Sequence, residues 1–347
     1  GAIPERPKLA DGPLLRTGMS DARVLVLRQL LDQPAASDTA YSADLAEAVR
    51  AFQRSMGLND DGVVGPATVA ALNGAGGATR ADIIANMERW RWLPEDLGEF
   101  NVFVNIPEYR VEVNKYGRPV WDSRVIVGTQ RRQTPIFSDN IRHVVTNPYW
   151  NVPPTILSQD VMPQVLTNPG YLASQNMELL YGGQIIDPMM VDWSRANPNQ
   201  FRVRQRPGRS NALGQVKFLF PNSHDVYLHD TPSKSLFARS YRAFSHGCVR
   251  VQNPMEFADA LMANEPNISR ASLESMFGPS ERWVNPQKQI PVHLAYFTLR
   301  VDEDGTIRSF GDLYGHNEKL IAAMGLDAIE PPAILAEAET APRELSP

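Results

Sequence analysis

The sequence predicts an α+β fold in which a small three-helix domain precedes a larger, mainly β domain that carries a helical insertion. Two changes of pattern predict this arrangement. Apolar residues recur at helical spacing up to about residue 73, whereas from Phe100 onward they alternate with polar residues, as in half-buried strands. Around residues 154–208 the alternation stops and a helix-like run appears. A chain of 347 residues with 43% hydrophobic residues has room for two or three such units.

The first part of the chain is predicted to form the three-helix domain, over residues 14–73, after a leader or linker rich in proline and charge, residues 1–13. Ser20 and Ser42 are expected to cap the first and second helices, and Pro66 to stand in the first turn of the third. The inner faces of the three helices are predicted to carry Val24, Leu27, Leu30 and Leu31, then Leu45, Val49, Phe52 and Met56, then Val69 and Leu72. This segment contains neither cysteine nor histidine, so it cannot supply a thiol nucleophile or an imidazole base.

The larger domain is predicted over residues 100–315, after a glycine-rich linker and a helix that occupy residues 74–99. Strand patterns lie at residues 100–106, 109–114, 119–128, 214–220 and 225–229, and a hairpin is predicted from residues 291–301 and 306–310. A helix is expected to begin at Asn253 or Pro254. Residues 316–347 are predicted to form a C-terminal helix and a loose tail.

Composition narrows the class of protein. The formal net charge of −5 gives no reason to expect nucleic acid as the main partner. No apolar run approaches the roughly 20 residues of a membrane-spanning helix, and no signal-peptide-like apolar region is present, so a mature, exported form without a transmembrane segment is expected. A single cysteine excludes a disulfide within the chain.

The candidate chemistry lies at Cys248, the single cysteine, which follows Gly247 and precedes Arg250 by two residues. A thiol attacks as its thiolate, and a free cysteine with a pKa of about 8.5 is mostly protonated at neutral pH. It therefore needs a base or a cation nearby, and His229, His246 and Arg250 are the local candidates. Gly247 allows the sharp backbone bend that an oxyanion hole requires.

Two other interpretations compete with a nucleophile. A lone cysteine is most often a small buried hydrophobic residue. A thiol with two histidines could also begin a zinc site, but no CxxC or HxxxH pair is present, so neither a metal nor another cofactor is expected. The neighbouring Ser-His-Gly and Val-Arg, with a His-Asp upstream, favour the nucleophile.

Two motifs carry a resemblance to enzymes of the bacterial cell wall. His229, fifteen intervening residues and then Ser245-His246-Gly247-Cys248-Val249-Arg250 resemble the signature of the L,D-transpeptidases. The run AFQRSMGL, followed by DGVVGPATVAAL, resembles a small peptidoglycan-binding module found in many wall enzymes. The resemblance implies a mainly β catalytic domain over residues 100–315, with residues 154–208 as an insertion that caps the active site.

The same resemblance implies a role for each motif residue. Cys248 would be the acyl-accepting nucleophile and His229 its general base, oriented by the backbone carbonyl of Asp230. The N–H groups of Gly247 and Cys248 would form the oxyanion hole, and His246 would shape the loop. The substrate-binding candidates are Arg250, Tyr227, Trp150, Ser245 and Asp230, although Tyr227 and Trp150 could equally belong to the core. Because the carbonyl of Asp230 would orient His229, its side chain need not take part, and a Cys-His-Asp triad is not required.

The implied reaction joins two peptidoglycan stem peptides in the periplasm through a 3→3 cross-link, with release of D-alanine. The acceptor stays open: an amine of a second stem, an amine of an outer-membrane protein, or water. A wall-binding protein with an inactive site is a third alternative. The arginines of the insertion, Arg195, Arg202, Arg204, Arg206 and Arg209, form either a solvated face or a surface for an acidic peptide.

Overall fold

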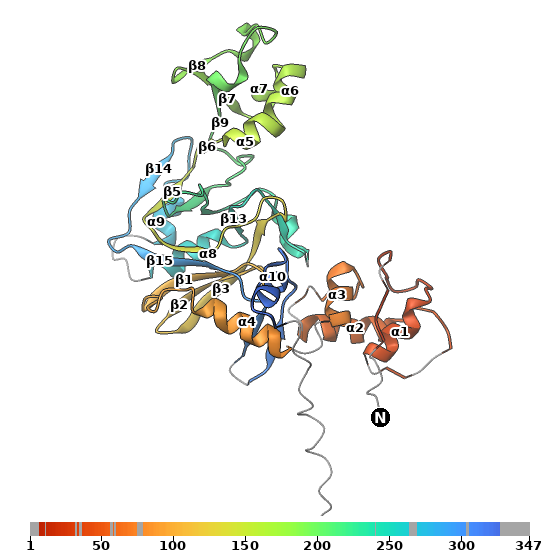
Figure 1. Ribbon diagram of the computed structural model, residues 1–347. Coiled ribbons are helices and arrows are strands. Elements are labelled where there is room, and N and C mark those ends of the chain that lie inside the picture. Colours follow the sequence, from red (N-terminus) through yellow and green to blue (C-terminus); the bar gives the residue numbers. More distant parts are fainter. Residues whose placement is uncertain are drawn as a thin grey trace, which may run out of the picture. The chain divides into compact units, whose positions relative to one another are not determined.

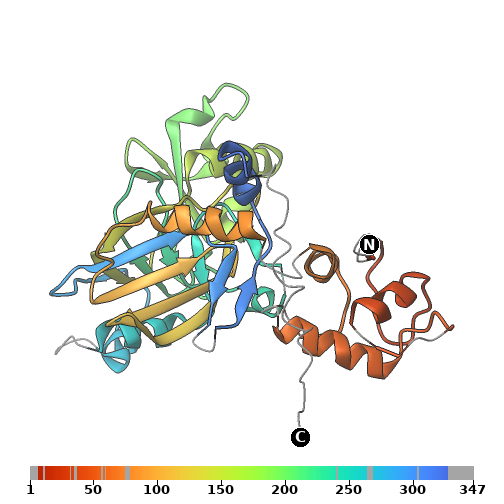
Figure 2. The ribbon, with the colours of Figure 1, turned by 60° about the horizontal axis from the view of Figure 1, so that its bottom comes forward.

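A computed structural model describes residues 7–326, apart from residues 11, 32, 35, 36, 56, 57, 59, 75–78, 240, 264–268, 303 and 304 (Figures 1 and 2). The expected leader is therefore described only from residue 7, and the expected tail only as far as residue 326. The chain divides into two compact units. One combines the segment up to Trp92 with the segment from Phe297 onward, and the other is Leu93–Tyr296.

The first unit contains the predicted three helices, α1 (Arg23–Leu30), α2 (Ala43–Ser55) and α3 (Pro66–Gly74). Ser42 caps α2, because its Oγ accepts a hydrogen bond of 3.2 Å from the N–H of Leu45, and Pro66 is the first residue of α3. Ser20 does not cap α1, which begins after Ala22 without a side-chain cap. Most of the predicted inner faces are buried together with Leu9, Leu15, Tyr41 and Val64, while Leu31 and Phe52 are partly buried and Met56 lies outside the described residues. The sequence pattern therefore identified the core of this region.

The same unit contains helix α4 (Arg80–Trp90), the hairpin β16 (Leu299–Val301) and β17 (Ile307–Ser309), and helix α10 (His316–Ala323). Buried polar groups of α4 bind this C-terminal segment: Asn86 donates to Thr298 Oγ1 at 2.9 Å, and Arg89 donates to Asn317 Oδ1 at 2.6 Å. Residues 297–315 thus group with α4, whereas the sequence suggested that they continue the catalytic domain.

The second unit is built on a mixed sheet with the strand order β14-β5-β10-β11-β13-β3-β2-β1-β15-β4, and β12 pairs with β3 beside that path. The strands are β1 (Phe100–Asn105), β2 (Arg110–Lys115), β3 (Arg118–Gly128), β4 (Phe137–Ile141), β5 (His143–Thr146), β10 (Val216–Leu219), β11 (Leu228–His229), β12 (Ala243–Ser245), β13 (Val249–Val251), β14 (Arg282–Val284) and β15 (Ile290–Ala295). The strand patterns predicted at residues 100–106, 109–114, 119–128, 214–220 and 225–229 correspond to β1, β2, β3, β10 and β11, although β11 is limited to Leu228–His229. The predicted hairpin arm at residues 291–301 is wrong as a single strand, because β15 pairs with β1 and β4 in this sheet and only β16 pairs with β17.

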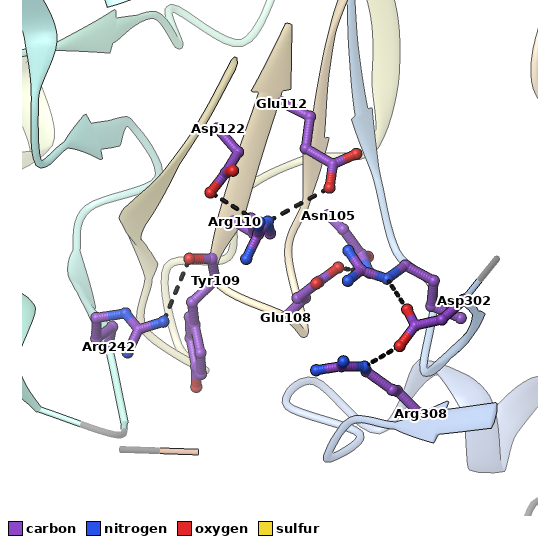
Figure 3. Close-up of polar contacts among 10 residues, drawn as sticks. Asn105, Glu108, Tyr109, Arg110, Glu112, Asp122, Arg242, Asp302 and Arg308 are labelled. Carbon is purple, nitrogen blue, oxygen red and sulfur yellow. Dashed lines mark hydrogen bonds and ion pairs between the residues drawn. The ribbon is translucent and has the colours of Figure 1, made fainter. Parts of the chain in front are cut away.

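The long strand β3 connects the two halves of the sheet. Its first part pairs with β2 and its last residues pair with β13 and β12. Across the β2–β3 pair, Glu112 and Asp122 stand directly opposite each other, and Arg110 forms ion pairs with both, at 3.3 and 2.8 Å (Figure 3). One cation thereby offsets the repulsion of two facing carboxylates.

Two helices follow the motif in the same unit, α8 (Pro254–Met262) and α9 (Arg270–Ser275). Helix α8 begins as the sequence predicts, with Asn253 before its first residue, Pro254. Its Phe257 is fully buried, with ring centroids 4.6 Å from Phe218 and 5.3 Å from Trp121. This helix fixes the apolar side of the sheet, so the reactive residues must use the other side.

The capping insertion is a compact subdomain, which we call the cap, Trp150–Gln205. Figure 1 shows its elements (green) gathered at one end of the large sheet. It contains α5 (Pro154–Ile156), a π-helical turn η1 (Leu157–Val161), α6 (Met162–Thr167), α7 (Tyr171–Ser174), and short 3₁₀ turns η2 (Pro188–Met190) and η3 (Pro198–Gln200), together with strands β6 (Trp150–Asn151), β7 (Met177–Tyr181), β8 (Gln184–Ile186) and β9 (Phe201–Gln205). The sequence predicted a helical insertion, whereas the cap also contains a four-stranded sheet with its own apolar core.

Among the residues that the structure describes, no helix combines the length and apolar character needed to span a bilayer.

Candidate active site

Two neighbouring strands bring the predicted nucleophile and base together. Strand β11 ends at His229 and runs parallel to β13, with His229 opposite Arg250 and Leu228 opposite Val249. Cys248 comes two residues before Arg250, so the strand alternation puts both side chains on the face of the sheet that carries His229. All three line one cleft of about 1140 Å³ between the cap and the sheet.

The loop that carries Cys248 is held by hydroxyl groups. Ser245 Oγ donates to the carbonyl of Cys248 and accepts from the N–H of Gly247 at 3.1 Å. Thr134 Oγ1 donates to the carbonyl of Gly247 at 2.8 Å and accepts from the N–H of Gly128 at 2.9 Å. Gly247 has φ of +118°, a conformation that side-chain-bearing residues rarely adopt, so a glycine is required at this bend.

The approach to this loop is anchored by Arg242, which is 5% exposed. Its guanidinium donates to the carbonyl of Tyr109 at 3.3 Å (Figure 3). It also donates to the carbonyls of Val125, at 3.3 Å, and of Arg239, at 2.8 Å. Burial lowers its pKa to about 10 and Arg124 adds to that effect, so the group stays cationic at neutral pH. The segment before β12 is therefore tied to the turn between β1 and β2 and to strand β3.

The thiol of Cys248 is protonated at neutral pH. Burial raises its pKa to about 11, against the opposing effects of the backbone N–H of Tyr227 and the cation of Arg250. Its Sγ also lies 3.8 Å from the carbonyl oxygen of Asp225, to which it donates. A thiol in this state needs a base that takes its proton as it attacks.

The imidazole of His229 is neutral and held in one tautomer. Its Nδ1 donates to the carbonyl oxygen of Asp230, which leaves the lone pair of Nε2 free to accept a proton. Burial lowers its pKa to about 3, and the cations of Arg250, Lys217 and Lys234 act in the same direction. The ring of Tyr227 packs against it edge-on, with centroids 5.6 Å apart.

The side chain of Asp230 does not take part in the cleft. Its carboxylate accepts from the N–H groups of Thr231 and Gln215, at 2.7 and 2.9 Å, and forms an ion pair with Lys234. These contacts hold the loops around β11, and Asp230 is absent from the cleft lining. The substrate-binding role expected for Asp230 is therefore not supported, and a Cys-His-Asp triad is not formed, because this residue meets His229 through its backbone carbonyl.

The expected oxyanion hole needs one correction. The N–H of Gly247 is engaged by Ser245 Oγ, so it is not directed at a substrate carbonyl. The N–H of Cys248 has no acceptor among the described residues and stays as the candidate donor from this loop. Ser245 supports the loop from inside, at 2% exposure.

His246 lies at the edge of the cleft and contacts the cap. Its Nε2 is 3.3 Å from Asp160 Oδ2 in η1, and Arg132 approaches the same carboxylate at 3.5 Å. Burial lowers the pKa of His246, Arg132 adds to that effect, and Asp160 opposes it. This position agrees with a role in shaping the loop and contacting the cap, and His229 is the better-placed base.

The other expected pocket residues also line the cleft: Arg250, Tyr227 and Trp150. Arg250 has no acidic partner among the described residues, and its buried Nε makes no hydrogen bond. Burial raises the pKa of Tyr227 well above its usual value, and the neighbouring Cys248 adds to that effect, so the phenol stays neutral. Trp150 stands in β6, opposite Gln205 of β9, and packs against the cap core.

Two interpretations were open for the arginines of the insertion, a solvated face or a surface for an acidic peptide. Neither applies to all five. Arg204 and Arg206 both bind the buried carboxylate of Glu178 at 2.6 Å, which is a contact within the cap. Arg202 lines the cleft and donates only to backbone carbonyls. Arg195 and Arg209 do not line it.

Three supporting residues escaped the sequence analysis: Thr134, Arg242 and Lys217. Lys217 lines the cleft and stands opposite His229 on the adjacent strand β10. Burial lowers its pKa, while Glu281, 3.5 Å away, opposes that effect. Its only signal in the sequence was a charged residue inside an apolar strand pattern, GQVKFLF.

The chain matches known protein families in two places. Residues 99–268 match the family described as "L,D-transpeptidase catalytic domain", and residues 26–72 match the "Putative peptidoglycan binding domain". A curated "Putative L,D-transpeptidase" of Haemophilus influenzae is 35% identical over 249 residues, which cover 71% of this chain and 50% of the relative. The chain thus spans about half the length of that relative.

Solved structures of low identity also match. An L,D-transpeptidase from Xylanimonas cellulosilytica (residues 123–326) is 18% identical, covers 85% of this chain and 99% of its own, and has a TM-score of 0.27. An L,D-transpeptidase from Stackebrandtia nassauensis is 12% identical, covers 83% and 96%, and has a TM-score of 0.29. The family assignment rests on the sequence matches, which contain the Cys248 loop, His229 and most of the cleft. By these matches the chain belongs to the L,D-transpeptidase family and carries a peptidoglycan-binding domain ahead of its catalytic domain.

Proposed function

We propose that the protein is a periplasmic cysteine acyltransferase that forms 3→3 cross-links between peptidoglycan stem peptides. The observation that carries the proposal is the protonation geometry of His229. Because Nδ1 donates to the carbonyl of Asp230, the free Nε2 belongs to the cleft that also contains the thiol of Cys248. A neutral imidazole and a protonated thiol that line one cleft are the two groups that general-base catalysis of thiol attack requires.

In the first step Cys248 Sγ would attack the carbonyl carbon of diaminopimelate in a tetrapeptide stem. His229 Nε2 takes the thiol proton and passes it to the leaving nitrogen, so a thioester forms, the amide bond breaks and free D-alanine leaves. In the second step the side-chain amine of a second stem attacks the thioester. His229 now accepts the amine proton and returns it to the sulfur, which restores the thiol.

Two other acceptors fit the same nucleophile: an amine of an outer-membrane protein, or water. The three outcomes differ in mass, so purified enzyme is incubated with isolated sacculi and the released and retained muropeptides are analysed by mass spectrometry. We expect dimers joined between two diaminopimelate residues, accompanied by free D-alanine. Tripeptides alone would indicate hydrolysis, and a protein-linked tripeptide would indicate anchoring.

Cys248→Ala serves as the control in this assay. If the variant forms the same dimers, the acyl-enzyme mechanism is wrong. If neither protein forms any product and Cys248 acquires no acyl group, the remaining interpretation is a wall-binding protein with an inactive site.

We further propose that residues 14–73 hold the enzyme on the wall polymer and contribute little to the chemistry. This region has its own apolar core and no thiol or imidazole. Tethering raises the local concentration of an insoluble substrate without new contacts at the reacting atoms. Deletion of residues 1–79 should reduce sedimentation with sacculi while the rate of acylation by a soluble tetrapeptide is retained.

A further inference from the structure

Two cations flank His229 on the cleft side of the sheet. Lys217 on β10 and Arg250 on β13 each stand directly opposite His229 in the strand register. The N–H of Asp230 bonds the carbonyl of Val216, which makes Lys217 and His229 a non-hydrogen-bonded pair, the closer of the two antiparallel pair types. All three side chains line the cleft.

The cleft as a whole is electropositive, although the chain has a net charge of −5. Its lining includes five basic side chains, Arg131, Arg132, Arg202, Lys217 and Arg250, but one carboxylate, Asp225, among the described residues. Such a lining attracts an anionic ligand. The two cations nearest the reacting groups are those beside His229.

Both cations keep hydrogen-bonding capacity for a ligand. Arg250 has no carboxylate partner in the described part of the chain, and its Nε lies buried without an acceptor. Lys217 contacts Glu281 at 3.5 Å, a long ion pair, and the same carboxylate already accepts from the N–H of Tyr149 at 3.0 Å and from Trp283 Nε1 at 3.1 Å. An ammonium group has three N–H donors, so Lys217 keeps donors that Glu281 does not engage.

The position of His229 decides which ligand group meets these cations. In the proposed function, Nε2 delivers a proton to the nitrogen of the leaving amino acid. The carboxylate of that amino acid is separated from the nitrogen by a single carbon atom. A nitrogen held at His229 therefore brings its own carboxylate to the side chains next to His229, which are Lys217 and Arg250.

We propose that Lys217 and Arg250 form a carboxylate site that binds the free terminal carboxylate of the leaving amino acid and so selects donors that end at that residue. This inference rests on the proposed function. It makes Lys217 a specificity-determining residue for the acylation step, and it gives a reason for a buried lysine in an otherwise apolar strand. In that step the sulfur–carbon bond forms, the carbon–nitrogen bond breaks, and the amino acid leaves with its carboxylate still ionised.

The test compares two soluble donors, a tetrapeptide with a free C-terminal carboxylate and the same tetrapeptide with that carboxyl group converted to a primary amide. The readout is kcat/KM for acylation of Cys248, followed by intact-protein mass spectrometry. The wild-type protein should prefer the free acid, and Lys217→Met should reduce that preference about tenfold to a hundredfold, the range of one charge-assisted hydrogen bond. Lys217→Arg should retain most of it.

Lys234→Met is the matched control. Lys234 is also a cation near His229, but it binds the carboxylate of Asp230 and does not line the cleft. Its loss can change the rate with both donors, yet the preference between them should persist. If the two lysines acted only through a general electrostatic effect on His229, each variant would change kcat/KM by the same factor with both donors.

The outcomes separate this inference from the proposed function. Equal acylation of the wild-type protein by the two donors overturns the carboxylate site and leaves the acyltransferase intact. A preference that survives in a folded Lys217→Met or Lys217→Gln protein, checked by its thermal unfolding, also overturns it. Failure of both donors to acylate wild-type Cys248 overturns the proposed function itself.

Discussion

Two sides of the cleft are held by different kinds of contact. We call the sheet side, with the Cys248 loop and His229, the floor, and the cap the roof. On the floor, the loop of Cys248 and the ring of His229 are fixed through Ser245, Thr134 and the carbonyl of Asp230, and the side chains that make these bonds are at most 3% exposed. The roof meets this loop through Asp160, which pairs with His246 and Arg132 at 3.3 and 3.5 Å.

The three side chains of this contact, Asp160, His246 and Arg132, are 33–47% exposed. Exposed ion pairs contribute little, because water screens them and the side chains lose freedom when they pair. A buried hydrogen bond leaves an unpaired polar group when it is broken, which costs more. We therefore expect substitutions on the floor to reduce acylation or stability strongly, and substitutions in the roof to change them little.

The largest effect is expected at the nucleophile. Cys248→Ala should abolish acylation by a soluble tetrapeptide, because no other thiol exists in the chain, while the small side chain leaves the loop bonds intact. Mass spectrometry of the protein after incubation with the donor measures this loss, and circular dichroism checks the fold. Residual acyl transfer by the alanine variant would show that Cys248 is not the nucleophile and that the floor does not carry the chemistry.

The second prediction concerns the two histidines, one from the floor and one from the edge. His229→Ala should lower kcat/KM for acylation by about a hundredfold to ten-thousandfold, the usual contribution of general acid–base catalysis. His246→Ala is the matched control. We expect it to change kcat/KM by no more than a few fold, because the His246 side chain contacts Asp160 of the cap. A larger loss in the His246 variant would assign the base to the other ring.

The third prediction follows from the pKa of His229, which is about 3 when folded, against about 6.5 when unfolded. The unfolded chain binds this proton first, so folding stability falls as the pH drops below about 6.5. Denaturant unfolding at pH 7 and pH 4.5 should show a loss that is smaller in His229→Gln, by on the order of a few kcal/mol. Identical losses in both proteins would mean that His229 is not buried as a neutral ring.

A fourth, smaller effect is expected at Thr134, which connects Gly128 and Gly247 through its hydroxyl group. Thr134→Val keeps the shape but removes the hydroxyl hydrogen bonds to two buried backbone groups, so the free energy of unfolding should fall by about 1–3 kcal/mol. Thr134→Ser should restore most of this, and urea titration measures both. Acylation by the valine variant should fall as well, since the carbonyl of Gly247 loses its anchor.

The smallest effect is expected at the roof. Asp160→Asn removes the charge that pairs with Arg132 and His246, and it should change stability by less than about 1 kcal/mol and acylation by a few fold at most. Raising the salt concentration should have a similarly small effect on the wild-type protein. A loss comparable with that of Thr134→Val would show that the cap is part of the rigid site.

The sequence predicts the reactive pair because a short motif carries it: Cys248 and His229 are separated by a characteristic interval, and the structure places both at one cleft. Lys217, Thr134 and Arg242 were missed for a common reason. Thr134 and Arg242 act on residues far along the chain, as Thr134 does on Gly247 across 113 positions, and Lys217 is brought beside His229 by strand register. The expected orientation of His229 by the carbonyl of Asp230 is present, whereas the motif could not show that Ser245 already occupies the N–H of Gly247.

The fold was predicted from periodicity, which reports burial but not which segment covers a strand or helix. The bounds of β1, β2 and β3 were therefore predicted closely, whereas the segment predicted as one strand at residues 291–301 forms two strands, β15 and β16. The grouping of residues 297–315 with α4 depends on buried contacts such as that of Asn86 with Thr298, 212 residues away. The small sheet of the cap was missed because its strands are two to five residues long, too short for alternation to be read.

Gly128, at the end of β3, offers a criterion for judging relatives that share the cysteine motif. A Cβ atom at this position would lie 2.1 Å from the carbonyl oxygen of Arg132 and 2.7 Å from the nitrogen of Thr134. The turn that follows β3 folds back so closely that any side chain would push Thr134 away from Gly247. A homologue with another residue here must support its nucleophile loop differently, so this one position can sort divergent sequences before any of them is purified.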